Sequence, residues 1–182
     1  MYRLRHIVLR NVRRYTFRFE VPSSSKQVEE DIRKILKSRS AVDALDYVKM
    51  IGEVNHSLIQ NRSINAVVYY LVKQDKYDLA ESLIESSKIT RDTKTYNILI
   101  EYWFEKNCPD RANHLMTQML CDNVRPDAST LTIAFSGYMR LGMLDNVLRL
   151  INEMYDEYNI QPSDIDEFVT FANVLIRELC KQ

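Results

Sequence analysis

The sequence has few of the residues that interrupt helices: three glycines and four prolines among 182 residues. This scarcity favours helices joined by short connections and argues against a fold of many strands and tight turns. No segment reaches the roughly 18 uninterrupted apolar residues that a membrane-spanning helix needs. The sequence therefore predicts an all-α protein without a membrane span.

Residues that bind metals or act in catalysis are also scarce. The cysteines, Cys108, Cys121 and Cys180, form no close pair, and only His56 and His114 lie beyond the basic N-terminal segment. We expect no zinc site and expect the cysteines to be small buried hydrophobic residues. The sequence has neither a glycine-rich phosphate loop nor a catalytic His/Cys/Asp spacing. It predicts a protein that is not an enzyme and that needs no metal or cofactor.

Charge is balanced overall, with 25 basic and 25 acidic side chains, but it is unevenly distributed. Residues 1–19 contain six arginines and no acid, and their apolar residues recur every three or four positions. This pattern is typical of a mitochondrial transit peptide, predicted at 1–15 and extending to about 19, and it implies the mitochondrial matrix. The alternative is a basic arm that is disordered or contacts RNA.

Three segments, 63–86, 95–118 and 130–153, superimpose without a gap, which indicates an internal repeat. In each, apolar residues mark one face of an α-helix twice in succession. A short polar corner separates the two faces. In these corners Pro109 suits the start of a second helix and Gly142 suits the end of a first. Each repeat is therefore predicted to be a helix–turn–helix hairpin.

A single hairpin cannot bury both of its apolar faces, so neighbouring hairpins must stack. We expect a degenerate hairpin at 26–60 and repeats at 61–92, 93–127 and 128–163. A helix at 164–182 would cap the stack. The predicted fold is an α-solenoid of about four hairpins with a C-terminal capping helix.

The repeat at 93–127 resembles a pentatricopeptide repeat. It is 35 residues long, carries Thr-Tyr-Asn near its start and ends in Pro-Asp. The tetratricopeptide pattern fits less well, because it expects Trp, Gly and Tyr in its first helix. The neighbouring repeats resemble the pentatricopeptide pattern less closely. The resemblance implies a protein that binds single-stranded RNA, with one base for each hairpin.

In that family two side chains of each hairpin contact the edge of a base. One lies in the first turn of the leading helix, and the other is the last residue of the repeat. Carried over to this sequence, the pairs are Asn65 with Asp92, Asn97 with Asp127, and Thr132 with Ser163. An Asn with a closing Asp favours uridine in that family, so the first two pairs imply uridine. The alternative is that these Asn and Asp side chains only cap helices.

Further groove positions carry charge. Lys73 and Arg140 are placed for phosphate, whereas Arg62 and Lys94 stand where the family holds aliphatic residues that sandwich bases. The equivalent residue of the best-matching repeat is Glu105, with Glu101 one turn before it, and these two carboxylates would repel phosphate.

The short array sets a limit on affinity. Stacking contributes ~1–3 kcal/mol per base, too little for two or three bases to select one RNA. We therefore expect the protein to act with other proteins in a mitochondrial ribonucleoprotein assembly, such as the mitochondrial ribosome, in RNA processing, stability or translation. The alternative is a non-catalytic protein–protein adaptor or structural subunit of a mitochondrial complex, which the two glutamates favour.

Overall fold

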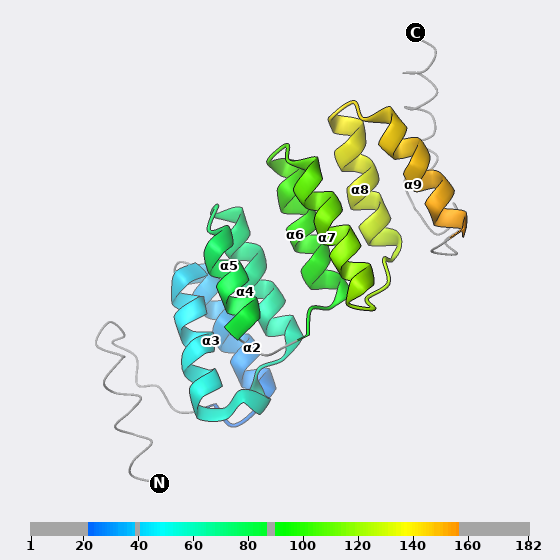
Figure 1. Ribbon diagram of the computed structural model, residues 1–182. Coiled ribbons are helices and arrows are strands. Elements are labelled where there is room, and N and C mark those ends of the chain that lie inside the picture. Colours follow the sequence, from blue (N-terminus) through cyan, green and yellow to red (C-terminus); the bar gives the residue numbers. More distant parts are fainter. Residues whose placement is uncertain (1–21, 39–40, 87–89, 157–182) are drawn as a thin grey trace. The chain divides into compact units, whose positions relative to one another are not determined.

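The computed structural model describes residues 22–38, 41–86 and 90–156. Within these ranges every regular element is helical (Figure 1), which confirms the all-α prediction. The predicted transit peptide and the predicted capping helix at 164–182 lie outside the described residues.

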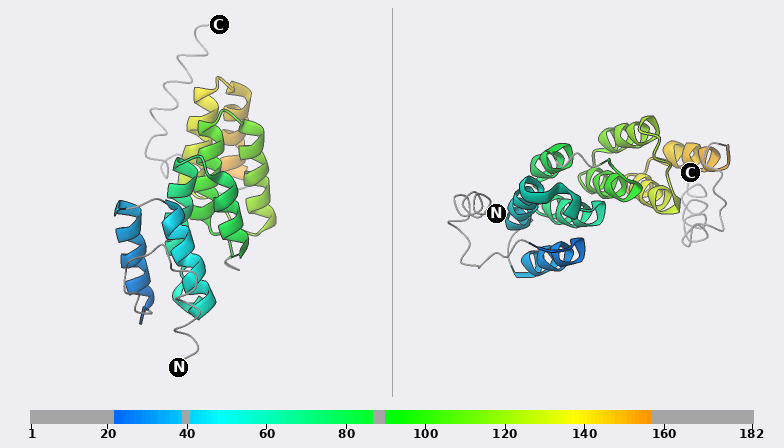
Figure 2. Two further views of the ribbon diagram at one scale, coloured as in Figure 1. Left: turned by 90° about the vertical axis from the view of Figure 1, so that its left-hand side faces the viewer. Right: turned by 90° about the horizontal axis from the view of Figure 1, so that it is seen from below.

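The chain divides into two compact units, Met1–Thr90 and Arg91–Gln182. The described part of the first unit holds α2 (Ser25–Ser38), α3 (Ala41–Asn55), the short 3-10 helix η1 (His56–Leu58), α4 (Asn61–Lys73) and α5 (Tyr77–Ser86). Here α2 pairs with α3 and α4 pairs with α5, and α4 also packs against α2 and α3 (Figure 2). The two hairpins of this unit therefore stack on each other.

The second unit repeats the arrangement. Its described helices are α6 (Thr93–Glu105), α7 (Pro109–Cys121), α8 (Ala128–Arg140) and α9 (Leu144–Asp156). The hairpin of α6 and α7 precedes the hairpin of α8 and α9, and α6 packs along α8. The leading helices of the two hairpins are therefore neighbours, which brings the first turn of α6 near the start of α8.

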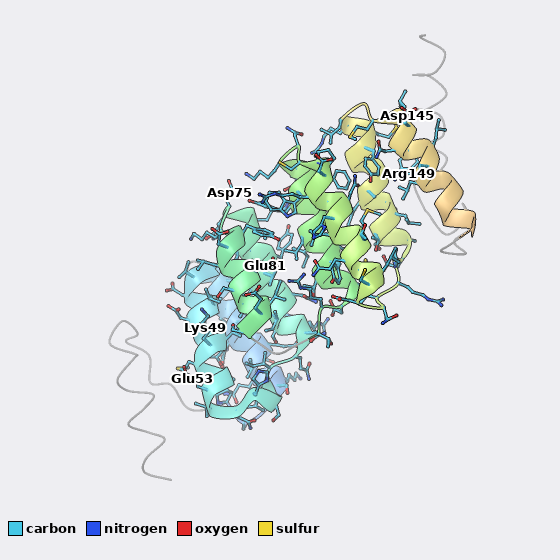
Figure 3. All side chains as sticks on the ribbon, in the orientation of Figure 1. Lys49, Glu53, Asp75, Glu81, Asp145 and Arg149 are labelled. Carbon is cyan, nitrogen blue, oxygen red and sulfur yellow. The ribbon has the colours of Figure 1, made fainter. Side chains whose placement is uncertain are left out.

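The apolar faces predicted from the sequence form the core of each unit. Ala44, Ala80 and Ala112, which head the second apolar face of their hairpins, are completely buried or nearly so. Because they carry only a methyl group, they let two helix backbones approach closely. Charged side chains lie on the opposite side of the helices, as Lys49 on α3 and Asp145 on α9 illustrate (Figure 3).

One close helix contact could not be foreseen from the apolar spacing. Gly137 on α8 faces the ring of Phe104 on α6, and a Cβ added to Gly137 would lie 2.3 Å from that ring. The Phe104 ring also meets Tyr138 edge to face, with centroids 5.0 Å apart. Only glycine fits at this point of contact between α6 and α8.

The expectation of buried cysteines is wrong for Cys121, which is exposed. The buried residues of α7 include Met116 and Met119. Cys121 ends the helix two residues after Met119, a step that turns it to the opposite side. Cys108 is partly exposed, and Cys180 lies outside the described residues.

Four of the described helices end with one residue in the left-handed conformation. These residues are Asp75 after α4 (labelled in Figure 3), Asn107 after α6, Asn123 after α7 and Gly142 after α8, with φ between 56° and 68°. In each case the next N–H donates to a carbonyl five residues back, at 2.9 Å. This is the Schellman arrangement, which satisfies the last carbonyls of a helix. Gly142 was predicted at such a place, and Pro109 indeed begins α7.

We predict that Asn107 carries a measurable backbone strain. Asn107→Gly should raise the free energy of unfolding of the second unit by about 0.5 kcal/mol, because glycine adopts positive φ without a Cβ clash. Asn107→Ala should lower it by about 1 kcal/mol, because alanine adopts this conformation less readily than asparagine. Chemical denaturation followed by fluorescence of Trp103, the single tryptophan of the chain, measures both changes. Equal stability of the Gly and Ala variants would contradict this account.

Candidate nucleic-acid interface

Aspartates begin both leading helices of the second unit. The Oδ1 atom of Asp127 accepts hydrogen bonds from the backbone N–H of Thr130 at 2.8 Å and from its hydroxyl at 2.9 Å. The hydroxyl oxygen in turn accepts from the N–H of Asp127 at 3.2 Å. Asp92 and Thr95 form the same capping box at the start of α6. The capping alternative considered for these two aspartates is therefore realised.

Asp127 also contacts Asn97, its partner in the base-contacting pair predicted from the sequence. The Nδ2 atom of Asn97 donates to Oδ1 of Asp127 at 3.4 Å. The contact exists because Asn97 lies in the first turns of α6, and α6 packs along α8. Its length is at the long end of hydrogen-bond distances, so it orients the amide without binding it tightly.

The other end of the same amide is unsatisfied. Among the described residues, Oδ1 of Asn97 is one of the buried side-chain atoms that lack a hydrogen-bond partner. A buried polar atom without a partner costs about 1–3 kcal/mol, so an added donor at this position would be stabilising. Asn97 therefore combines an oriented N–H donor with an acceptor that has no partner.

The other two predicted pairs are not assembled within one described unit. Asn65 belongs to the first unit, where only 3% of its surface is exposed, and Asp92 belongs to the second. The hydroxyl of Thr132 donates to the carbonyl of Ala128 in its own helix at 2.8 Å. Ser163 lies outside the described residues. Both pairings stay predictions.

The predicted basic contacts have different surroundings. Arg62, Lys73 and Lys94 are exposed. The Arg140 guanidinium donates to the carbonyl of Phe104 near the end of α6, so it links α8 to α6. A phosphate contact by Arg140 stays a prediction, and it would have to form beside this bond.

In the first unit, α4 lacks the aspartate that begins α6 and α8 of the second. Gln60 is the N-cap of α4 and makes no side-chain capping bond. Ser63 stands where Thr95 and Thr130 stand in the other repeats. Its hydroxyl oxygen is buried and has no partner among the described residues, because the carboxylate that would accept from it is replaced.

We predict that Gln60→Asp restores this capping box. The new carboxylate would accept from the N–H and hydroxyl of Ser63, and the free energy of unfolding of the first unit should rise by about 1 kcal/mol. Gln60→Ala is the matched control and should change little, because Gln60 makes no capping bond. Denaturation followed by far-UV circular dichroism compares the variants. A Gln60→Asp variant no more stable than Gln60→Ala would contradict the prediction.

Tyrosine hydroxyls join helices in both units. Tyr96 on α6 donates to Asp122, the C-cap of α7, and so closes that hairpin. Burial, together with the hydrogen bond to and charge of Asp122, raises the pKa of Tyr96 to about 12. In the first unit Tyr47 donates to Asp31 at 3.1 Å, and burial with the nearby Asp31 carboxylate raises the pKa of Tyr47 above its ordinary value.

We predict that alkaline pH weakens the second unit through Tyr96. The unfolded chain loses the phenolic proton near pH 10, whereas the folded state holds it to about pH 12. The free energy of unfolding should therefore fall as the pH rises from about 10 to about 12. Tyr96→Phe should show a shallower fall, measured by denaturation with Trp103 fluorescence at each pH. An equally steep fall in Tyr96→Phe would rule out this role.

The described residues offer little for other chemistry. Among them there is no group of three or more His, Cys, Asp or Glu placed to hold a metal ion. None of their helices has the length and apolar character needed to cross a membrane.

Comparison with known proteins decides the family. Residues 91–140 match the model of the PPR (pentatricopeptide) repeat family, and residues 129–157 match that of the PPR repeat. The two matches cover both hairpins described in the second unit. The chain belongs to the pentatricopeptide repeat family. The resemblance drawn from the Thr-Tyr-Asn and Pro-Asp motifs is confirmed.

Curated relatives of this PPR chain come from Arabidopsis thaliana. A chloroplastic pentatricopeptide repeat-containing protein is 28% identical over 148 residues, which covers 76% of this chain and 18% of that protein. A mitochondrial one is 23% identical over 114 residues, which covers 63% of this chain and 13% of that protein. The chain thus spans less than a fifth of the length of these relatives.

Proposed function

We propose that this PPR chain binds single-stranded RNA and recognises one base with the Asn97–Asp127 pair. The observation that carries the proposal is the contact between the Asn97 amide and the Asp127 carboxylate at the start of two neighbouring leading helices. Repeats of this family place one base opposite each hairpin, and base identity is sensed by two or three side chains.

The chemistry of the pair suits uridine. The Watson–Crick edge of the uracil base offers an N–H donor between two carbonyl acceptors. Asn97 can donate its second N–H to one of these carbonyls. Because Asp127 accepts from the same amide, it fixes which end of Asn97 is the donor. We also propose uridine for Asn65 with Asp92, on the family resemblance alone.

The proposed setting is the mitochondrial matrix. The arginine-rich segment at 1–15 supports import into mitochondria. The named relatives include a mitochondrial and a chloroplastic protein. Because a few recognised bases cannot select one transcript, the protein would act in RNA processing, stability or translation within a ribonucleoprotein assembly such as the mitochondrial ribosome. In this role it binds RNA and performs no catalysis.

A protein–protein adaptor is the second candidate. Glu101 and Glu105 place two carboxylates along α6, and these would repel an RNA backbone. The dependence of affinity on salt concentration distinguishes the two functions. RNA binding releases counterions from the RNA, so the affinity falls steeply as the salt concentration rises. The affinity of an apolar contact with a protein partner would change little with salt concentration.

We predict that Asn97→Ala removes a base preference. Binding of the full chain to short RNAs that differ by uridine or cytidine at one position is measured by fluorescence anisotropy at low salt. The preference for uridine should fall by about fivefold, since the loss of one hydrogen bond to the base edge costs about 1 kcal/mol. Thr117→Ala, on the exposed side of α7, is the control and should keep the preference.

Asp127→Asn separates recognition from folding. Asparagine caps a helix about as well as aspartate, so the variant should stay folded. It should nevertheless weaken the uridine preference, because the neutral amide oxygen accepts from Asn97 less strongly than the charged carboxylate does. Wild-type protein that binds no RNA, or that binds all bases equally, would contradict the proposed function.

A further inference from the structure

The exposed side of α4 carries aromatic rings and positive charge together. Tyr69 and Tyr70 are 40% and 41% exposed, and their rings meet edge to face with centroids 5.6 Å apart. The Lys73 ammonium lies 5.7 Å from the centroid of the Tyr69 ring. Arg62 is exposed near the start of the same helix. We call these four residues, Arg62, Tyr69, Tyr70 and Lys73, the α4 stripe.

Helical spacing makes the stripe a continuous surface. Arg62, Tyr69 and Lys73 follow one another at intervals of seven and four residues, which places them on one side of the helix. The buried residues Val67 and Leu71 occupy the opposite side and hold α4 in its unit. Arg62, Tyr69 and Lys73 therefore lie on the side of α4 away from these core residues.

The charge of this stripe differs from that of the equivalent surface on α6. The sequence of α4 contains no acidic residue. In the gap-free superposition of the repeats, Tyr69 corresponds to Glu101 and Lys73 corresponds to Glu105. Phosphate groups would thus be repelled near the end of α6 and attracted near the end of α4, whereas the first turns are alike because Arg62 corresponds to Lys94.

We propose that the α4 stripe is a nucleotide-stacking surface for single-stranded RNA. Bases stack on the exposed rings of Tyr69 and Tyr70, while Lys73 and Arg62 contact neighbouring phosphates. Exposed aromatic rings beside cations suit this ligand, because each nucleotide brings one flat ring and one negative charge. The inference rests on the proposed RNA binding and adds affinity that is independent of base identity, since every base has a π-face.

The test uses the full chain and oligomers of twelve uridines or twelve adenosines. Tyr69→Ala/Tyr70→Ala should bind both oligomers at least about fivefold more weakly than wild type, the minimum expected for one lost stack. Tyr69→Phe/Tyr70→Phe is the matched control, because it keeps the rings, and it should bind like wild type. Circular dichroism verifies that the exposed substitutions leave the helices intact.

The phosphate contact has its own readout. Lys73→Ala should make the salt dependence of binding shallower, with the slope of log K against log salt reduced by about 0.7, the value for one phosphate on a single strand. An unchanged slope would overturn the assignment of Lys73 to phosphate.

The outcomes distinguish this inference from the proposed function. If wild type binds RNA and the double alanine variant binds equally well, the α4 stripe is not a stacking surface, and the proposed function stands. A double alanine variant that loses only the uridine oligomer would also overturn the inference, because stacking does not select bases. If wild type binds neither oligomer, the proposed function itself fails.

Discussion

The carboxylate of Asp127 is the group on which both the fold and the candidate site of the second unit depend. The first N–H groups of a helix have no partner within the helix, and Asp127 supplies one for Thr130 at the start of α8. The same Oδ1 atom accepts from Asn97 of the neighbouring leading helix. A residue required for helix initiation therefore also orients the amide proposed to contact a base.

The two units use one repeat with different chemistry at equivalent positions. In the second unit, α6 and α8 each have an aspartate and a threonine at their start. In the first unit, α4 has Gln60 and a Ser63 hydroxyl that lacks a partner among the described residues. Where α4 has Tyr69 and Lys73, α6 has Glu101 and Glu105. The apolar spacing fixes the hairpin, and the residues between the apolar positions determine what each hairpin can bind.

Sequence patterns predicted the helices well, because burial requires apolar residues every three or four positions whatever their identity. They also placed Pro109 and Gly142 correctly, since these residues have strong backbone preferences. The left-handed ends at Asn107 and Asn123 were missed, because asparagine also suits caps and turns. The contact of Arg140 with the Phe104 carbonyl joins residues 36 positions apart and depends on how α8 packs on α6, which no local pattern contains.

Photo-crosslinking of the full chain to an RNA that contains 4-thiouridine tests the central claim most directly. A base held by Asn97 and Asp127 lies beside the first turn of α6 and the start of α8, so crosslinked peptides from this RNA should include the stretch around Asn97 or the stretch around Asp127. Crosslinks confined to the second helices of the hairpins, α5, α7 and α9, would contradict the claim and show that RNA contacts a different surface.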